Sequence, residues 1–138
     1  MKRVMSLLSI LLLMVSVSAM AADPIQDLID VAVPVNIDGK QPGLEEVKAA
    51  VISGCRKRGW IPVVSGPNQI TAKLDVRSKH FAEVDITYNV NTYSIVYKSS
   101  TNLDYNEEKR KIHRNYNKWV SMLSSTIQRE FGVNAQGF

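Results

Sequence analysis

ITAKLDVRSKHFAEVDITYNVNTYSIVYKS, residues 70–99, decides the fold because apolar and polar side chains alternate along almost its whole length. The alternation runs through three segments, 70–77, 80–89 and 93–99, which short polar stretches separate. Successive side chains of a β-strand point to opposite faces, so each segment has one apolar and one polar face. Strands of this kind, joined by short loops, form an antiparallel meander with one face buried and the other in water.

The loop between the second and third segments indicates how those two strands pair, since residues directly opposite one another must share a face. Pairing Tyr88 with Tyr93 leaves the four-residue loop 89–92 and places Glu83 opposite Lys98. Two aromatic side chains then share the buried face and two opposite charges share the wet face, which stabilises a cross-strand pair. We therefore predict this register.

The first hairpin requires a longer connection than a tight turn. Pairing Val76 with Ala82 places Lys73 opposite Asp85 on the wet face. A two-residue turn would instead place an apolar residue opposite a glutamate, and one side chain would then face the wrong side of the sheet. The sequence therefore predicts a loop or bulge at residues 78–80.

Two helices flank the meander. Residues 44–58 carry apolar side chains every three or four residues, with acidic residues in the first turn, basic residues in the last and Gly59 as a stop. Residues 112–131 carry a second stripe, whose aromatic side chains Tyr116 and Trp119 are expected to enter the core. The predicted stripe consists of Ile112, Tyr116, Trp119, Val120, Leu123 and Ile127.

Shorter apolar runs complete the set of predicted elements. Residues 30–37 form a strand that Pro34 marks as an edge strand, and residues 60–64 form the first strand of the meander. The order is then strand, helix, four strands, helix. We predict an α+β fold, a two-layer sandwich in which a curved antiparallel sheet carries both helices on one face, because each element has one apolar side to bury.

Residues 1–21 have the features of a cleaved secretory signal peptide. A positively charged start precedes an apolar run, 4–17, and small residues occupy the positions that a signal peptidase reads. The run is shorter than the roughly twenty residues that a transmembrane helix needs, so a retained anchor is the weaker alternative. The sequence therefore predicts one domain, residues 22–138, that works in the periplasm without a stable membrane anchor.

Charge and cysteine content argue against a nucleic-acid-binding protein and against a domain stabilised by internal disulfides. The formal net charge of the whole chain is +4 and falls to +2 without Lys2 and Arg3, which is too mild to imply nucleic-acid binding. The single cysteine, Cys55, cannot form an internal disulfide. It shares a helix face with apolar residues, so we expect it in the core rather than as a nucleophile.

The sequence gives little support for catalysis. His80 and His113 are far apart, and no closely spaced carboxylate or cysteine completes a metal site or a catalytic group. Asp75 falls opposite Glu83 in the predicted register, but basic residues surround the pair, which favours a solvated charge mesh. We therefore predict no enzymatic activity, no metal and no cofactor. A hydrolase using His80 or His113 with Asp75 or Glu83 is a third alternative, which requires the fold to bring them together.

The polar connection YKSSTNLDYNEE, residues 97–108, is the main candidate for binding. Aromatic and hydrogen-bonding side chains held between a strand and a helix suit a loop that recognises a partner protein or an envelope component. An ordinary polar crossover would have the same composition. The candidate binding residues are Tyr97, Ser99, Asn102, Asp104, Tyr105, His113 and Asn117.

A carrier of a small apolar or amphipathic ligand is the alternative function. A curved sheet covered by a helix can leave a cavity, which Tyr88, Tyr93, Tyr97 and Tyr116 could line. The same tyrosines could equally fill the core with their hydroxyl groups at its rim.

Four stretches of the chain, GWIPV, AKLDVRSKHFAEVDITYN, YSIVYKSSTNL and KIHRNYNKWVSML, resemble a family of small uncharacterised bacterial exported proteins. Many members of that family are labelled as lipoproteins. The resemblance covers about Val47 to Ile127, and its most specific part is the pattern Ile-His-x-x-Tyr-Asn-x-Trp-Val at Ile112–Val120. It implies the same fold and compartment and no particular activity. A lipid anchor does not carry over, because no cysteine stands at the cleavage point.

Overall fold

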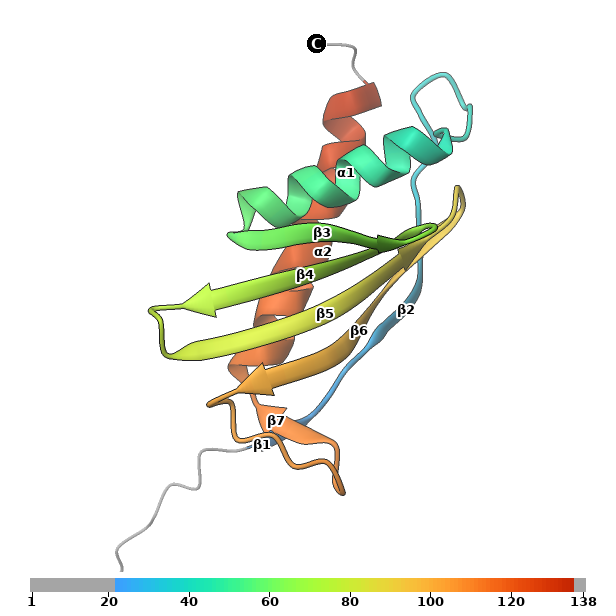
Figure 1. The fold of residues 1–138 in the computed structure, drawn as a ribbon. Helices are drawn as coiled ribbons and strands as arrows, with labels where there is room; N and C mark the ends of the chain where they lie inside the picture. The colour runs from blue at the N-terminus through green and yellow to red at the C-terminus, as the bar shows by residue number, and fades with distance from the viewer. Residues whose placement is uncertain (1–21, 136–138) are drawn as a thin grey trace, which may run out of the picture.

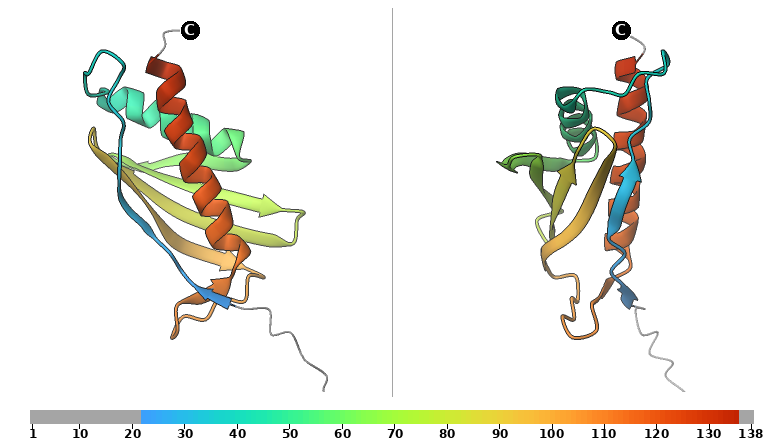
Figure 2. Two further views of the ribbon diagram at one scale, coloured as in Figure 1. Left: turned by 180° about the vertical axis from the view of Figure 1, so that it is seen from behind. Right: turned by 90° about the vertical axis from the view of Figure 1, so that its right-hand side faces the viewer.

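The sheet and the helices form two layers in the computed structural model, which describes residues 22–135 (Figure 1). Five antiparallel strands form a curved sheet in the order β2-β6-β5-β4-β3, and both helices lie on one face, as predicted (Figures 1 and 2). A two-stranded sheet of β1 and β7 lies beside it. The elements are β1 (Ala22–Pro24), β2 (Leu28–Ala32), α1 (Leu44–Lys57), β3 (Trp60–Gly66), β4 (Gln69–Val76), β5 (His80–Tyr88), β6 (Thr92–Thr101), β7 (Lys111–His113) and α2 (Asn115–Ala135).

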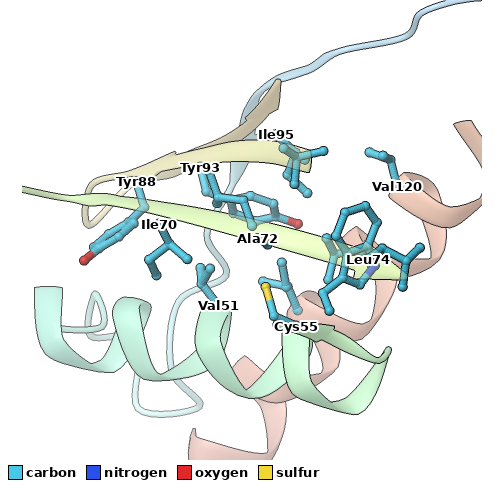
Figure 3. Packing of buried hydrophobic residues seen from close by; sticks show 14 of the residues in the cluster. Val51, Cys55, Ile70, Ala72, Leu74, Tyr88, Tyr93, Ile95 and Val120 are labelled. Carbon is cyan, nitrogen blue, oxygen red and sulfur yellow. The ribbon is translucent and has the colours of Figure 1, made fainter. Parts of the chain in front are cut away.

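The core lies between the sheet and the two helices. Figure 3 shows Val51 and Cys55 of α1 directed toward Ile70 and Ala72 of β4. The alternating apolar side chains of β4, β5 and β6 are buried here, whereas their polar neighbours remain on the opposite face. Cys55 is fully buried as predicted, and burial raises the pKa of its thiol to about 12. A thiol in this state is protonated at neutral pH and is not a nucleophile.

Helix α1 agrees with its predicted bounds to within one residue. Glu45 and Glu46 occupy its first turn and Arg56 and Lys57 its last, where each sign of charge meets the favourable end of the helix dipole. Gly59 follows with φ of +78°, the left-handed conformation that commonly ends a helix. The helix therefore stops where the chain must turn back to start β3.

The two helices cross in close contact at Gly54. A Cβ atom on this residue would lie 2.6 Å from Ile127 Cγ1 and 3.0 Å from Ile127 Cα in α2. Distances below 3.0 Å do not occur between real Cβ atoms and their neighbours, so only glycine fits at this crossing. The hydrogen bond between Tyr93 Oη and Ser124 Oγ, at 2.7 Å, ties α2 to the sheet as well.

The β5–β6 hairpin follows the predicted register near its turn. Tyr88 pairs with Tyr93, as expected. Beyond Val84 a bulge shifts the register by one residue, so Glu83 lies opposite Ser99 and the predicted pair of Glu83 with Lys98 is wrong. The wet face still carries a charge mesh, because a lysine of β6 forms an ion pair with a β5 carboxylate at 3.8 Å.

The predicted register of the β4–β5 hairpin is wrong by two residues. Val76 pairs with His80 rather than Ala82, and Asp75 lies opposite Phe81 rather than Glu83. The connection is a three-residue loop, 77–79, whose first two residues have φ of +58° and +54°. The Asp75 carboxylate stabilises this loop by accepting a hydrogen bond of 2.7 Å from the backbone N–H of Ser78.

Helix α2 begins later than predicted. Residues 112 and 113 belong to β7, in which Ile112 lies opposite Asp23 and His113 opposite Ala22 of β1. Ile112 is fully buried in β7, and the predicted helix also placed it in the core, so its apolar character does not distinguish strand from helix. Tyr116 is fully buried as predicted, but Trp119, which the pattern places in the same stripe, is only partly buried.

The N-terminal strands are the least well predicted part of the fold. The strand expected at 30–37 is instead β2, which ends at Ala32 and pairs with β6 through an irregularity at Asp30, where φ is +51°. Val35 and Ile37 beyond it are exposed. The pairing of β1 with β7 was not predicted, because a three-residue strand has no periodicity to detect.

Candidate functional site

The predicted recognition loop separates two surface hollows. Tyr97, Ser99 and Tyr105 line one of about 550 Å³, which we name the tyrosine hollow. Asn102, Asp104 and the two histidines line another of about 430 Å³, the histidine hollow. Six of the seven candidate binding residues therefore reach a hollow, but they divide between two sites.

Packing holds the tyrosine hollow in place. The ring of Tyr97 lies 4.6 Å from that of Tyr105 and contacts the ring of Tyr116 edge-on at 5.5 Å, measured between centroids. Burial raises the pKa of Tyr97, although its hydrogen bond with Ser100 opposes the shift. Tyr105 is 37% exposed, so the stack leaves an aromatic face open to a partner.

Asn117 lies elsewhere and holds the N-terminal segment against α2. Its side-chain oxygen accepts a hydrogen bond of 3.1 Å from the backbone N–H of Gln26, and its amide nitrogen donates one of 2.9 Å to the backbone oxygen of Pro24. Both polar ends of the side chain are therefore engaged between β1 and β2. This residue has a structural part in the fold.

We expect Asn117→Ala to lower the free energy of unfolding by about 1–2 kcal/mol, because two hydrogen bonds to the N-terminal segment are lost. Asn117→Asp is the matched control, since it keeps the acceptor for Gln26 and loses only the donor to Pro24. It should fall between the wild type and the alanine variant in urea unfolding. Equal stability of all three proteins would contradict the structural part assigned to Asn117.

The fold brings His80 and His113 to the same hollow, although they are far apart in the sequence. His80 Nδ1 lies 2.8 Å from the backbone oxygen of Asn102, which can only accept, so Nδ1 donates this hydrogen bond. His113 Nδ1 accepts a hydrogen bond of 3.2 Å from the backbone N–H of Asn115, at the start of α2. The two rings are thus held by backbone groups rather than by carboxylates.

The carboxylates of the hydrolase alternative lie elsewhere. Asp75 contacts its own loop, and Glu83 forms an ion pair of 3.3 Å with Lys73. Among the residues that line the histidine hollow, Asp104 alone has a carboxylate, and none has a hydroxyl or thiol group. Within residues 22–135, no cluster of histidine, cysteine and carboxylate side chains could hold a metal ion.

An apolar hollow of about 190 Å³ adjoins the histidine hollow. Both tryptophans of the chain, Trp60 and Trp119, line it, together with Met122 of α2. The strand side is formed by Leu74 and Val76, where β4 ends. Sequence reasoning missed this site because it placed Trp119 in the core stripe.

A third hollow of about 370 Å³ continues along α2. Thr126, Arg129 and Glu130 line it from the helix, and Lys57 and Arg58 line it from the end of α1. Glu130 accepts hydrogen bonds from Lys57 at 2.6 Å and from a serine of α1 at 2.9 Å. The contact with Lys57 holds the pKa of Glu130 below its usual value, so this carboxylate is charged and neutralises that lysine.

The three hollows lie next to one another along one side of α2, because each shares a lining residue with the next. Trp119 is shared by the histidine hollow and the apolar hollow, and Arg58 is shared by the apolar hollow and the third. We name the combined surface the α2 groove. Its helix wall follows spacings of three and four residues, typical of one helix face: Asn115, Trp119, Met122, Thr126 and Arg129.

No known protein family, curated protein or solved structure matches this chain. Neither α1 nor α2 is long and apolar enough to cross a membrane, so among the described residues no helix spans a bilayer. The geometry of the groove therefore carries the functional inference, and the resemblance to small exported proteins stays a prediction.

Proposed function

We propose that this chain is an exported, non-enzymatic binding domain of the periplasm that holds a partner protein or another envelope component in the α2 groove. The observation that carries the proposal is the row of three adjacent hollows, of which both tryptophans line the central one. Aromatic side chains at the centre of a depression, with polar side chains around it, are typical of protein-binding surfaces. The tyrosine hollow offers a second contact surface beyond the 102–110 loop.

The apolar hollow is small for a carrier of whole ligands, so its size favours the binding of a partner over the carrier alternative. Pockets for whole small ligands usually measure about 300–1,000 Å³, and the apolar hollow measures about 190 Å³. Tyr93 and Tyr116, expected to line a carrier cavity, are each 1% exposed and pack in the core. The groove is therefore better suited to one apolar group of a larger partner.

A photo-crosslinking amino acid at position 122 tests the binding proposal in cells. Met122 is 45% exposed on the groove, and Ile61, the control position, is 64% exposed on the opposite face of the sheet. We expect a discrete adduct from position 122 that is absent from position 61 and is reduced by Trp119→Ala. Adducts that form equally at both positions, or at neither, would overturn the proposal.

The proposed export of the protein can be tested separately from the proposed binding. Cleavage before Ala22 would leave every described element in the mature chain. N-terminal sequencing of the protein from a periplasmic fraction should therefore begin at Ala22. A chain that keeps Met1, or that stays in the cytoplasmic fraction, would contradict export.

We expect His113→Gln to lower the free energy of unfolding by at most about 1 kcal/mol, because the glutamine oxygen can replace Nδ1 as acceptor for Asn115. It should rescue a deletion strain fully. Glutamine cannot transfer protons near neutral pH, so a hydrolase would lose its activity. A stable variant that crosslinks normally at position 122 but fails to rescue would show that His113 is catalytic.

A further inference from the structure

We infer that the α2 groove recognises an acidic segment of a partner protein that carries one aromatic side chain; this inference rests on the proposed binding function. Residues 79 and 80, at the tip of the β4–β5 hairpin, line one end of the groove. This hairpin projects past α2 in the left view of Figure 2. The centre of the groove is apolar and its two ends are charged. The occupant follows from the size of the centre and the sign of that charge.

The apolar centre fits a single ring. A cavity of about 150 Å³ lined by apolar side chains is large enough to bind benzene, and the hollow between Trp60 and Trp119 measures about 190 Å³. A phenyl group placed there would contact both indole rings and the side chain of Met122, which are favourable aromatic and sulfur contacts. A lipid acyl chain would need a longer apolar channel than this one.

The charged ends are predominantly basic. Arg58, Lys79, Arg114 and Arg129 line the groove, and none of them makes an ion pair within the part of the chain that the structure describes. The opposing carboxylates are Glu130, which Lys57 neutralises, and the exposed Asp104. Arg58 and Arg129 each donate a hydrogen bond to Thr126 Oγ1, at 2.7 and 3.3 Å, and keep their charge. With Lys57 included, five basic and two acidic side chains line the groove, which gives it a formal net charge of +3.

The length of the groove sets the length of the segment. Residues 115 to 129 of α2 form its helix wall, which spans about 21 Å at 1.5 Å per residue. An extended segment of about six or seven residues covers that distance. An aromatic residue near the middle of such a segment would reach the apolar hollow while acidic residues on either side reach the basic ends.

A blocked peptide of sequence EDEFEDE is the probe, and the fluorescence of the two groove tryptophans reports its binding to the purified protein. We expect saturable binding that weakens as salt is added. It should weaken about tenfold or more when phenylalanine is replaced by alanine, or when the acidic residues are replaced by lysine and arginine. Two competing occupants of the groove, a lipid surface and a second copy of the chain, are tested by sedimentation. The protein is sedimented with anionic vesicles in one experiment and by itself in the other.

Charge-reversal variants test whether the peptide binds in the groove. The double substitution Lys79→Glu and Arg114→Glu changes two exposed groove positions and should weaken peptide binding by about tenfold. Lys109→Glu, an exposed charge reversal outside the groove, is the control and should change binding less than twofold. Both proteins should unfold at the same temperature as wild type to within a few degrees.

The outcomes separate the two proposals. Equal binding of the acidic and basic peptides, no binding of either, or stronger binding of vesicles or a second copy would overturn the acidic-segment inference. Crosslinking from position 122 then decides the proposed function by itself. An adduct there preserves the groove as a binding site for another chemistry, and no adduct removes both proposals.

Discussion

Tyr116→Ala should lower the free energy of unfolding by about 3–5 kcal/mol, as large-to-small substitutions of aromatic core residues do. Tyr116 is 1% exposed, and its ring contacts Tyr97 edge-on at a centroid distance of 5.5 Å. The substitution removes this contact and leaves a cavity where α2 meets the sheet. Urea unfolding measures the effect.

Trp119→Ala is the matched comparison, because the two aromatic residues lie three positions apart on the same helix. Trp119 is only partly buried and lines two hollows, so its loss should cost about 1–2 kcal/mol, less than the full burial value. It should instead abolish binding in the groove. If Trp119→Ala proved as destabilising as Tyr116→Ala, the tryptophan would be a core anchor and the groove would lose its centre.

Gly54→Ala should destabilise the protein by about 2 kcal/mol. Alanine gains about 1 kcal/mol over glycine from helix propensity. Overpacking typically costs about 1–3 kcal/mol and occasionally more, and here the new Cβ would meet both a side-chain atom and the Cα of Ile127. Because a backbone atom cannot rotate away, we place the clash at the upper end, and it outweighs the gain.

Gly66→Ala is the control for this prediction. A Cβ on Gly66 would lie 3.8 Å from the nearest atom, which is ordinary van der Waals contact. The free energy of unfolding of the Gly66→Ala protein should therefore stay within about 0.5 kcal/mol of the wild-type value. Thermal unfolding of both variants measures the difference, and a Gly54→Ala protein as stable as the control would mean that the helices do not cross as closely as described.

Alternation identified the strands of the meander but not every register. The two-residue shift between the predicted and observed β4–β5 pairing keeps every side chain on its own face, so no pattern of apolar residues can separate the two registers. The left-handed conformations of Arg77 and Ser78 decide between them. For β5–β6, the pairing of Tyr88 with Tyr93 was predictable because it closes a four-residue loop.

The start of α2 also could not be predicted from the pattern of apolar residues. An apolar residue at position 112 fits both a buried strand and the apolar stripe of a helix. The choice between them depends on pairing with β1, which lies about ninety residues away in the sequence. The α2 groove was not predictable for a related reason. It forms where the ends of α1, β3 and β4 meet one side of α2, and no local pattern states which strand ends meet which helix face.

The pairing of β1 with β7, and of β2 with β6, also determines the order in which the chain can fold. Ala22 pairs with His113, and Leu28 pairs with Ile95, so the first strands made find their partners only near the end of synthesis. Contacts between distant residues must overcome a large loop-closure entropy and slow the search for the native state. In a nascent chain of this topology, β2 stays unpaired until about residue 95 has emerged, and β1 until about residue 113. That delay leaves both N-terminal strands without a partner for most of the synthesis of the chain.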